Sequence, residues 1–214
     1  GRIVAFKDLT GQKVDPYDDN GHGTHVAGDI ASDGNKSQHR YKGPAPEAKL
    51  VGVKVLNKMG SGSLSTVIKG VEWCIQNKDA YSIRVMNLSL GSDAVQSYKD
   101  DPVCQAIEKA WKAGIVVCIA AGNSGPESGT INSPGIHPDV ITVGALNDID
   151  PDNPEGKIVA DFSSRGPTKD GLTKPDVLSP GVGIVSLRSP KSNLDKQRKD
   201  TRTEEWYTTL SGTS

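Results

Sequence analysis

The sequence predicts an α/β fold in three layers, in which a mostly parallel sheet carries helices on both of its faces. The first observation is a series of short runs, rich in Val and Ile, that are almost entirely apolar. Strands buried on both faces have this composition. The second observation is that segments with helical periodicity stand between these runs. Strands that alternate with helices favour a parallel sheet covered on both sides.

Five runs are expected to be strands and three segments are expected to be helices. The strands are residues 3–6, 50–56, 85–88, 115–120 and 140–145, and the helices are residues 25–32, 64–76 and 102–113. Within the second helix, Val67, Val71 and Ile75 recur on one face. Pro102 opens the third helix, at a position where its missing N–H is tolerated.

The segments that follow the strands are informative, because the active cleft of such a sheet lies beyond the carboxyl ends of its strands. Residues 89–92 (Ser-Leu-Gly-Ser) follow the third strand, and residues 120–126 (Ala-Ala-Gly-Asn-Ser-Gly-Pro) follow the fourth. Small side chains at these exits allow another backbone to approach closely. No repeat or linker divides the 214 residues, so we expect a single domain that spans residues 1–214.

The charge pattern excludes two classes of partner. The formal net charge is −1, with acidic and basic residues interspersed, which gives no electrostatic reason to expect nucleic acid or an anionic membrane. Residues 191–202 are rich in bases, and we interpret them as a solvated surface loop rather than a binding tract. No apolar run approaches the length of a transmembrane helix.

The cysteines indicate thiols rather than a disulfide framework. There are three, Cys74, Cys104 and Cys118, without metal-like spacing. Cys118 lies in an apolar run and Cys74 in a helical segment, where a thiol behaves as a small hydrophobic group. Free thiols favour a reducing compartment. We therefore expect a cytoplasmic protein, with secretion as the alternative.

A histidine between two glycines is the most unusual feature of the chain. Residues 21–25 read Gly-His-Gly-Thr-His, which keeps bulky side chains away from His22 and suits a ring that must meet another group in a cleft. Ser214 follows a turn of small residues, Ser211-Gly212-Thr213. A serine in such a turn is a nucleophile that a histidine can activate as general base.

Three motifs in chain order resemble those of the subtilases, the subtilisin family of serine proteases. They are residues 21–25, residues 120–123 (Ala-Ala-Gly-Asn) and residues 211–214 (Ser-Gly-Thr-Ser). The likeness covers the whole chain through further segments, residues 60–62, 89–91, 162–167 and 179–181. The resemblance implies a subtilisin-like fold and a serine endopeptidase of broad specificity that needs no cofactor for its chemistry. The free cysteines resemble the intracellular bacterial branch of the family more than the secreted branch.

The resemblance also implies roles for individual residues. His22 is the general base, Ser214 is the nucleophile that forms the acyl-enzyme, and Asn123 donates its side-chain amide to the oxyanion. The groove binds an extended polypeptide by adding it as a strand. Asn132 lies near the floor of the primary pocket, and the Ser133–Pro134 bond is cis. The residues implied to bind substrate are Gly60, Ser61, Gly62, Ser89, Leu90, Gly91, Ala120, Ala121, Gly122 and Asn132.

Several side chains also have a simpler interpretation. His25 is expected to be a structural, hydrogen-bonded histidine rather than a second base. A zinc site at His22 and His25 is not expected, because the pair lacks a third ligand at a recognisable spacing. His39 and His137 are expected at the surface, and residues 162–167 as a structural turn. Oxygen ligands gather at alternate positions in one acidic loop, where a structural calcium ion could bind, although a solvated loop is the alternative. That loop contains Asp148, Asp150, Asp152 and Glu155.

The third catalytic residue of the family, an aspartate followed by Thr or Ser and then Gly, has no counterpart that we assign. Asp8 carries an extra residue before Thr10-Gly11 and lies too near His22 in sequence; Asp18 and Asp19 belong to the loop that enters the histidine motif. We expect this aspartate and its strand before residue 1, and the family's central helix after Ser214. The fold is then incomplete at both ends, a partial catalytic domain that is the central portion of its parent.

Two classes of function follow from these expectations. The first is a serine endopeptidase, of which this segment alone is nearly inactive and poorly stable; its partners are extended polypeptides and the remaining segments of its parent chain. The second is a non-catalytic relative that binds peptides in the same groove. His22, Asn123 and Ser214 together favour the first class, because a binding module needs none of them.

Overall fold

The computed structural model describes residues 1–11, 13–148 and 156–214. The chain forms two compact units. The first combines Gly1–Gly70 with Ile184–Leu210, and the second combines Val71–Gly183 with Ser211–Ser214. Helix α2 (Leu64–Gln76) runs from the first unit into the second. The expectation of one domain over residues 1–214 stays a prediction.

The first unit contains a parallel pair of strands and an antiparallel sheet. Strands β1 (Ile3–Asp8) and β2 (Leu50–Lys54) pair in parallel. The antiparallel sheet has the order β8-β10-β9. Its strands are β8 (Ile184–Leu187), β9 (Arg202–Glu204) and β10 (Tyr207–Leu210). Two 3₁₀ turns, η1 (Asn35–Ser37) and η3 (Lys199–Thr201), and the short helix α4 (Asn193–Gln197) complete this unit.

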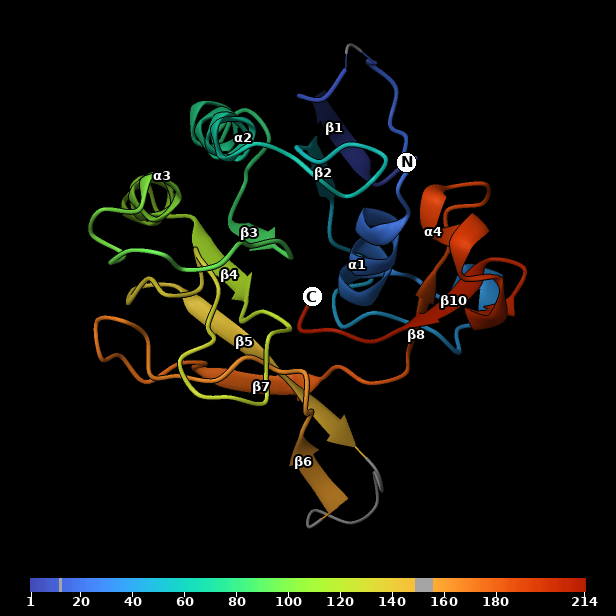
Figure 1. Ribbon diagram of the computed structural model, residues 1–214. Coiled ribbons are helices and arrows are strands. Elements are labelled where there is room, and N and C mark those ends of the chain that lie inside the picture. Colours follow the sequence, from blue (N-terminus) through green and yellow to red (C-terminus); the bar gives the residue numbers. More distant parts are fainter. Residues whose placement is uncertain (12, 149–155) are drawn as a thin grey trace. The chain divides into compact units, whose positions relative to one another are not determined.

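Helix α1 (His22–Ala31) packs against β8 in the first unit (Figure 1). The close approach depends on Gly28, because a Cβ at that position would lie 2.3 Å from Ser186 Oγ and 2.9 Å from Leu187 Cγ. The Ser186 hydroxyl also donates to the His25 carbonyl at 2.8 Å. Small residues after His22 therefore let its helix contact the sheet directly.

The second unit contains the mostly parallel sheet that the sequence predicts. Strands β3, β4, β5 and β7 pair in parallel, side by side in Figure 1, and β6 adds to β5 in the antiparallel direction. Helix α3 (Pro102–Lys112) packs on β4. The strands are β3 (Val85–Leu88), β4 (Val116–Ala120), β5 (Ile141–Asp148), β6 (Lys157–Val159) and β7 (Val177–Pro180).

The core of the second unit lies where α3 meets β4. Ile107 of the helix is fully buried, as are Ile115, Val117 and Ile119 on and beside the strand. Val85 and Val116 point the other way and are 61% and 41% exposed. Apolar residues on both sides of a strand predict burial of both sides, whereas the described chain buries only one side of β3 and of the start of β4.

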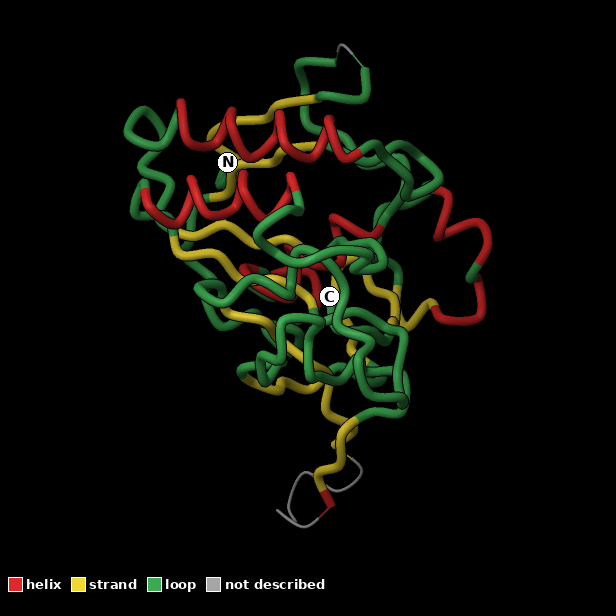
Figure 2. The backbone as a smooth tube through the Cα atoms, turned by 60° about the vertical axis from the view of Figure 1, so that its left-hand side comes forward, coloured by secondary structure: helices red, strands yellow, loops and turns green. Residues whose placement is uncertain are grey.

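The predicted elements are present with small differences in their bounds. Strands β1 to β5 and helices α1 to α3 lie at the predicted positions, and α1 begins at His22 instead of residue 25. Strands β6 to β10 and helix α4 are not among the predicted elements. They are short segments that lie between loops, and Figure 2 draws these loops in green. Among the described residues, no helix is long and apolar enough to cross a membrane.

Candidate active site

The His22 motif is held by side chains of the loop that precedes it. The Asp18 carboxylate accepts hydrogen bonds from the Gly21 and Thr24 N–H groups at 2.8 Å each, and from the Thr24 hydroxyl at 2.7 Å. The Asn20 amide oxygen accepts from the His22 N–H at 3.1 Å. These acceptors satisfy N–H groups that a helix start leaves unpaired. Helix α1 can therefore begin at His22, three residues earlier than predicted.

The surroundings of His22 favour its neutral form. Burial lowers the pKa of the imidazole, and the electrostatic interaction with His25 lowers it further, against the opposing effect of Asp18 and Asp29. A neutral imidazole is the form that can accept a proton as general base. Among the described residues, no carboxylate accepts a hydrogen bond from the His22 ring.

His25 ties α1 to the antiparallel sheet. The ring is buried, and Nε2 lies 3.1 Å from the Ile184 carbonyl and 3.2 Å from the Thr208 carbonyl. On the other side, Nδ1 lies 3.0 Å from an Asp29 carboxylate oxygen. All three partners are hydrogen-bond acceptors, so each ring nitrogen lies beside a group to which an N–H can donate. These contacts are those of the structural histidine that the sequence predicts.

Asp8 is occupied within its own turn. It ends β1, and its carboxylate accepts from the Thr10 N–H at 2.8 Å, the Gly11 N–H at 2.9 Å and the Tyr17 hydroxyl at 2.8 Å. Burial opposes ionisation of Asp8, but the hydrogen bonds from Tyr17, Thr10 and Gly11 outweigh it and hold the pKa well below its usual range. These contacts agree with leaving Asp8 out of the catalytic assignment.

In the second unit, Asn123 is fixed to the segment that carries Ser214. Its side-chain oxygen accepts from the Thr213 N–H at 2.9 Å and from the Thr213 hydroxyl at 3.0 Å. The Gly122 N–H donates to the Thr213 hydroxyl at 3.1 Å. With the amide oxygen engaged in this way, the NH₂ group of Asn123 stays free to donate to another acceptor.

The predicted pocket segments of the second unit lie side by side. Ser92 and Ser133 exchange two backbone hydrogen bonds, at 3.0 and 2.9 Å, which places residues 89–91 along residues 132–133. The Asn132 N–H donates to the Ala121 carbonyl at 2.9 Å. The structure therefore brings together residues 89–91, residues 120–122 and Asn132. Ser89 also contacts the segment that carries Ser214, since its hydroxyl donates to the Ser214 carbonyl at 2.6 Å.

The Asn132 side chain lies over Gly122. A Cβ on Gly122 would be 1.7 Å from the Asn132 amide oxygen, and its φ of +109° favours glycine. The Asn132 amide nitrogen lies 3.5 Å from an Asp93 carboxylate oxygen. Sequence reasoning missed Asp93, because nothing in the local pattern shows that the exit of β3 faces Asn132. The Ser133–Pro134 bond is cis, as predicted.

The third predicted substrate segment belongs to the first unit. Residues 60–62 follow β2 in a turn in which the Gly60 N–H donates to the Asn57 carbonyl at 2.9 Å. The side-chain amide of Asn20 donates to the Lys58 carbonyl at 3.1 Å. Asn20 therefore contacts both the turn that precedes residues 60–62 and the first N–H of the His22 helix.

Two other sequence expectations have different outcomes. His39 is exposed, as expected. The prediction that His137 lies at the surface is wrong, since it is 2% exposed. Its ring packs edge-on against Tyr98 at 5.4 Å, and its Nδ1 accepts from the Asp139 N–H at 3.2 Å. A polar loop context gave no sign of this aromatic contact.

The calcium site in the acidic loop stays a prediction. Asp148 ends β5, whereas Asp150, Asp152 and Glu155 lie outside the described residues. Within residues 1–11, 13–148 and 156–214, no group of three or more His, Cys, Asp or Glu side chains is arranged to hold a metal ion.

Comparison with known proteins places these motifs in a family. The model of the subtilase family matches residues 6–214. Serine protease AprX of Bacillus subtilis (strain 168) is 58% identical over 219 residues, which cover 100% of this chain and 50% of that protein. Subtilisin DY of Bacillus licheniformis is 37% identical over 199 residues, which cover 92% of this chain and 59% of that protein.

Solved structures agree with the sequence relatives. Sphericase superimposes with a TM-score of 0.77 and 31% sequence identity, over 98% of this chain and 66% of that chain. The psychrophilic protease S41 gives a TM-score of 0.74 at 32% identity, over 97% of this chain and 64% of that one. The chain thus spans about half to two thirds of the length of the proteins it matches.

Proposed function

Because the chain belongs to the subtilase family, we propose that the protein is a serine endopeptidase that cleaves polypeptides through an acyl-enzyme. In this proposal His22 accepts the proton of the Ser214 hydroxyl as the serine attacks the scissile carbonyl. His22 then delivers that proton to the leaving amine, and water hydrolyses the acyl-enzyme by the same route. The lowered pKa of His22 supports its role as the proton acceptor.

The observation that carries the proposal is the orientation of Asn123. Thr213, the residue before Ser214, donates twice to the amide oxygen, so the NH₂ group is the part of the Asn123 side chain left to donate. Donors placed where negative charge develops stabilise the transition state of acyl transfer. Loss of one such donor typically costs about 2.7–4 kcal/mol, a figure that comes from this family. A module that only binds peptides has no use for this arrangement.

Substrate binding in the proposal uses backbone more than charge. Residues 60–62 and 89–91 receive an extended polypeptide as an added strand, and residues 120–122 with Asn132 line the primary pocket. Main-chain pairing tolerates many sequences, which supports broad specificity.

The chemistry of the proposal needs no cofactor. We propose that calcium, if it binds near Asp148, has a structural role only, which a rise in melting temperature on adding calcium would show. We also propose a cytoplasmic location on the basis of three free thiols.

Labelling with a fluorophosphonate tests the proposed function on the full-length protein. We expect the probe to attach to Ser214 and the label to be lost in His22→Ala, whose folding is checked by circular dichroism. Asn123→Ala should retain the labelled serine but turn over a peptide substrate about 10²–10³-fold more slowly. A folded full-length protein that binds peptides and does not react with the probe would instead be the non-catalytic relative.

A further inference from the structure

The connection between β8 and β10 is much longer than their pairing requires. Leu187 of β8 pairs with Tyr207 of β10, a register that a hairpin turn of two to about five residues could close. Residues 188–206 stand there instead and include strand β9. We call residues 188–202 the basic strap. It contains α4 and η3.

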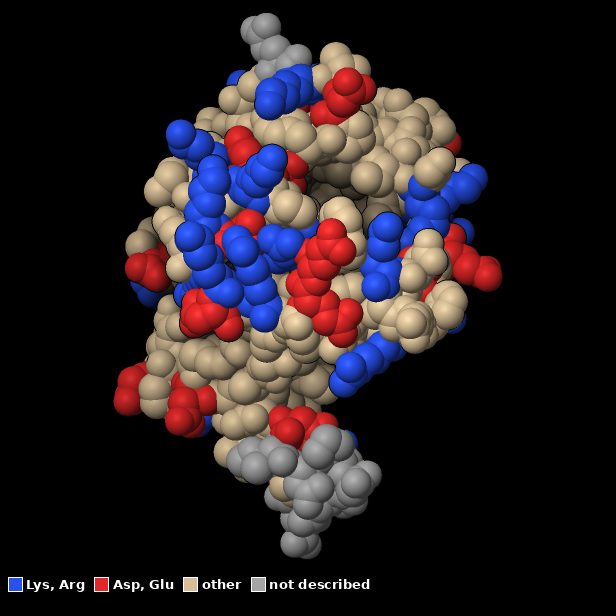
Figure 3. All heavy atoms as spheres, turned by 90° about the vertical axis from the view of Figure 1, so that its right-hand side faces the viewer, with Lys and Arg blue, Asp and Glu red and all other residues tan. Residues whose placement is uncertain are grey.

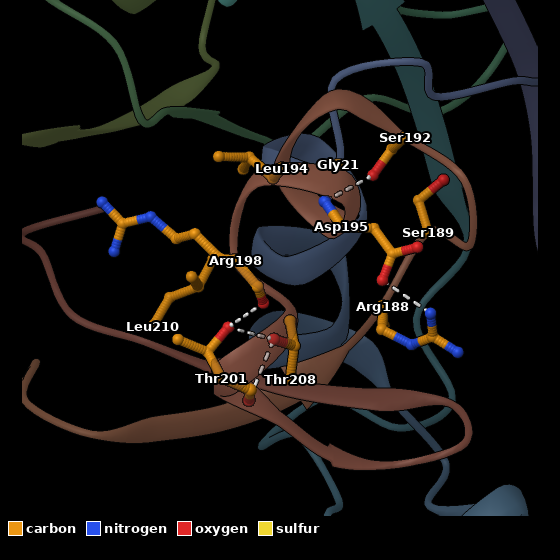
Figure 4. A pocket seen from close by; sticks show the side chains of 10 residues that line it. All are labelled: Gly21, Arg188, Ser189, Ser192, Leu194, Asp195, Arg198, Thr201, Thr208 and Leu210. Carbon is orange, nitrogen blue, oxygen red and sulfur yellow. Dashed lines mark hydrogen bonds and ion pairs between the residues drawn. The ribbon is translucent and has the colours of Figure 1, made fainter.

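A buried carboxylate gives the basic strap a fixed shape. Asp195 is 8% exposed, and its carboxylate accepts from Arg188 at 2.6 Å (Figure 4). It also accepts from Arg202 at 2.7 Å and from the Lys191 N–H at 2.8 Å. Burial opposes its ionisation, but these partners, Arg188 first, hold its pKa below the usual range. The interpretation of residues 191–202 as a solvated loop does not account for such an anchored interior.

The basic strap is fastened to the loop that carries His22. The Asn193 and Leu194 N–H groups donate to the Asp19 and Asn20 carbonyls at 2.8 and 2.9 Å. Contact continues to Gly21, where a Cβ would lie 2.6 Å from Ser192 Oγ. The strap therefore lies against the residue that directly precedes the proposed catalytic base.

The outer side chains of the strap carry positive charge without a partner. The strap contains six basic and two acidic residues, whereas the net charge of the whole chain is −1. Arg188 and Arg202 use the Asp195 carboxylate. The others are exposed, and among the described residues none forms an ion pair; they are Lys191, Lys196, Arg198 and Lys199. Basic side chains group on this side of the molecule (Figure 3).

A small hollow lies beside Gly21, and Arg198 of the strap is one of the residues that line it. Leu194 and Leu210, both half-buried, line that hollow together with Arg198. In Figure 4 the guanidinium of Arg198 points away from Asp195 and toward no partner among the residues drawn. An exposed guanidinium next to apolar side chains suits a carboxylate on a flexible polypeptide.

We propose that the basic strap is a docking surface for acidic side chains that flank the scissile bond of a polypeptide substrate. The inference rests on the proposed function, since the strap is hydrogen-bonded to the loop that carries His22, the proposed general base. Lys196, Arg198 and Lys199 attract the acidic segment and shorten its search, which acts on association and KM more than on kcat. The substrate class is thus acidic polypeptides within an otherwise broad specificity.

The test compares two peptides of equal length with the full-length protein, one carrying Glu on both sides of the scissile bond and one carrying Gln. Lys196→Gln/Arg198→Gln/Lys199→Gln is the strap variant. The matched control is Lys69→Gln/Lys109→Gln/Lys157→Gln, which removes the same charge from exposed lysines outside the strap. We expect the Glu-to-Gln ratio of kcat/KM to fall about tenfold in the strap variant, through KM, and to stay within about twofold in the control. The tenfold difference between the strap variant and the parent protein should disappear at roughly 0.5 M salt, because salt screens the attraction between exposed charges.

A binding measurement separates this inference from the proposed function. Ser214→Ala cannot turn over peptide, yet fluorescence anisotropy of the labelled Glu peptide should still show weaker binding when the strap is neutralised. If no peptide is cleaved, the proposed function fails while this measurement still decides the role of the strap. Equal Glu-to-Gln ratios of kcat/KM in the strap variant and in the control variant would overturn the inference. So would a preference of the strap for a DNA oligonucleotide or anionic vesicles over the Glu peptide.

Discussion

Two single residues, Asp18 and Asn123, have comparable roles at the His22 motif and at the segment that carries Ser214. Asp18 uses its carboxylate on N–H and O–H groups at the start of the His22 helix. Asn123 uses its amide oxygen on Thr213. In each case a short polar side chain satisfies nearby donors, as such side chains do in caps and turns. Among the described residues, the His22 ring and the Asn123 NH₂ group are thus left able to form further hydrogen bonds.

Gly122, in one of the predicted pocket segments, leaves no room for a side chain. Gly122→Ala places a methyl group 1.7 Å from the Asn132 amide oxygen and forces an L side chain to a φ of +109°. We expect the free energy of unfolding to fall by about 1–2 kcal/mol for the backbone and about 1–3 kcal/mol more for the clash. Urea denaturation measures the loss.

Gly171→Ala is the matched control, because Gly171 has a φ of +77° and no atom within 4 Å of its Cβ position. It should show the backbone cost alone. Equal losses in the two variants would mean that Asn132 moves aside freely and does not occupy the space over Gly122.

Among the elements, α3 shows how a helix start and a pocket strand share one residue. Asp101 caps the helix by accepting from the Val103 and Cys104 N–H groups at 2.8 and 3.0 Å. Its second oxygen accepts from the buried Ser133 hydroxyl at 2.7 Å. The cap of α3 therefore also holds the segment that pairs with the exit of β3.

Asp101→Ala should destabilise the protein by about 2–4 kcal/mol, because it removes a cap and leaves a buried hydroxyl without its acceptor. Asp101→Asn keeps one oxygen for the cap and offers its NH₂ group to the Ser133 oxygen. We expect it to stay within about 1 kcal/mol of the parent. A comparable loss in both variants would show that the negative charge, rather than the hydrogen bonds, stabilises the helix start.

At the same scale, the sequence predicts those elements whose apolar residues repeat with one period. Val67 and Val71 on α2, and the apolar run of β4, have such a pattern, and both elements lie where expected. The start of α1 depends on Asp18, a contact between loop and helix that no periodicity reports. Strands β6 and β9 have three residues each, too few to show a period, and they pair with the neighbouring strands β5 and β10. Their existence depends on neighbours that local pattern does not specify.

At the scale of the whole molecule, some residues of the candidate site can be predicted from local motifs, and others depend on which loops meet in the fold. The motifs alone suggest His22, Asn123 and Ser214, because unusual residue types stand at fixed positions within them. Asp93 and the buried state of His137 depend on which loops meet after folding. Charge composition predicts residues 191–202 as a surface loop, and most of them are exposed. It does not show that the buried Asp195 anchors this segment.

The three thiols report on the integrity of the molecule as a whole. Burial raises the pKa of Cys74 to about 11 and, with Asp101 nearby, that of Cys104 to about 12. At pH 8 the reactive thiolate is then about 10⁻³ of Cys74 and about 10⁻⁴ of Cys104. Cys118 is half-buried, and burial raises its pKa as well. We expect iodoacetamide to label Cys118 first in the native protein and to label Cys104 only as fast as the protein unfolds, with mass spectrometry locating each label. In urea all three should react at similar rates. Native labelling of Cys104 as fast as that of Cys118 would show that the α3 core opens without unfolding of the rest.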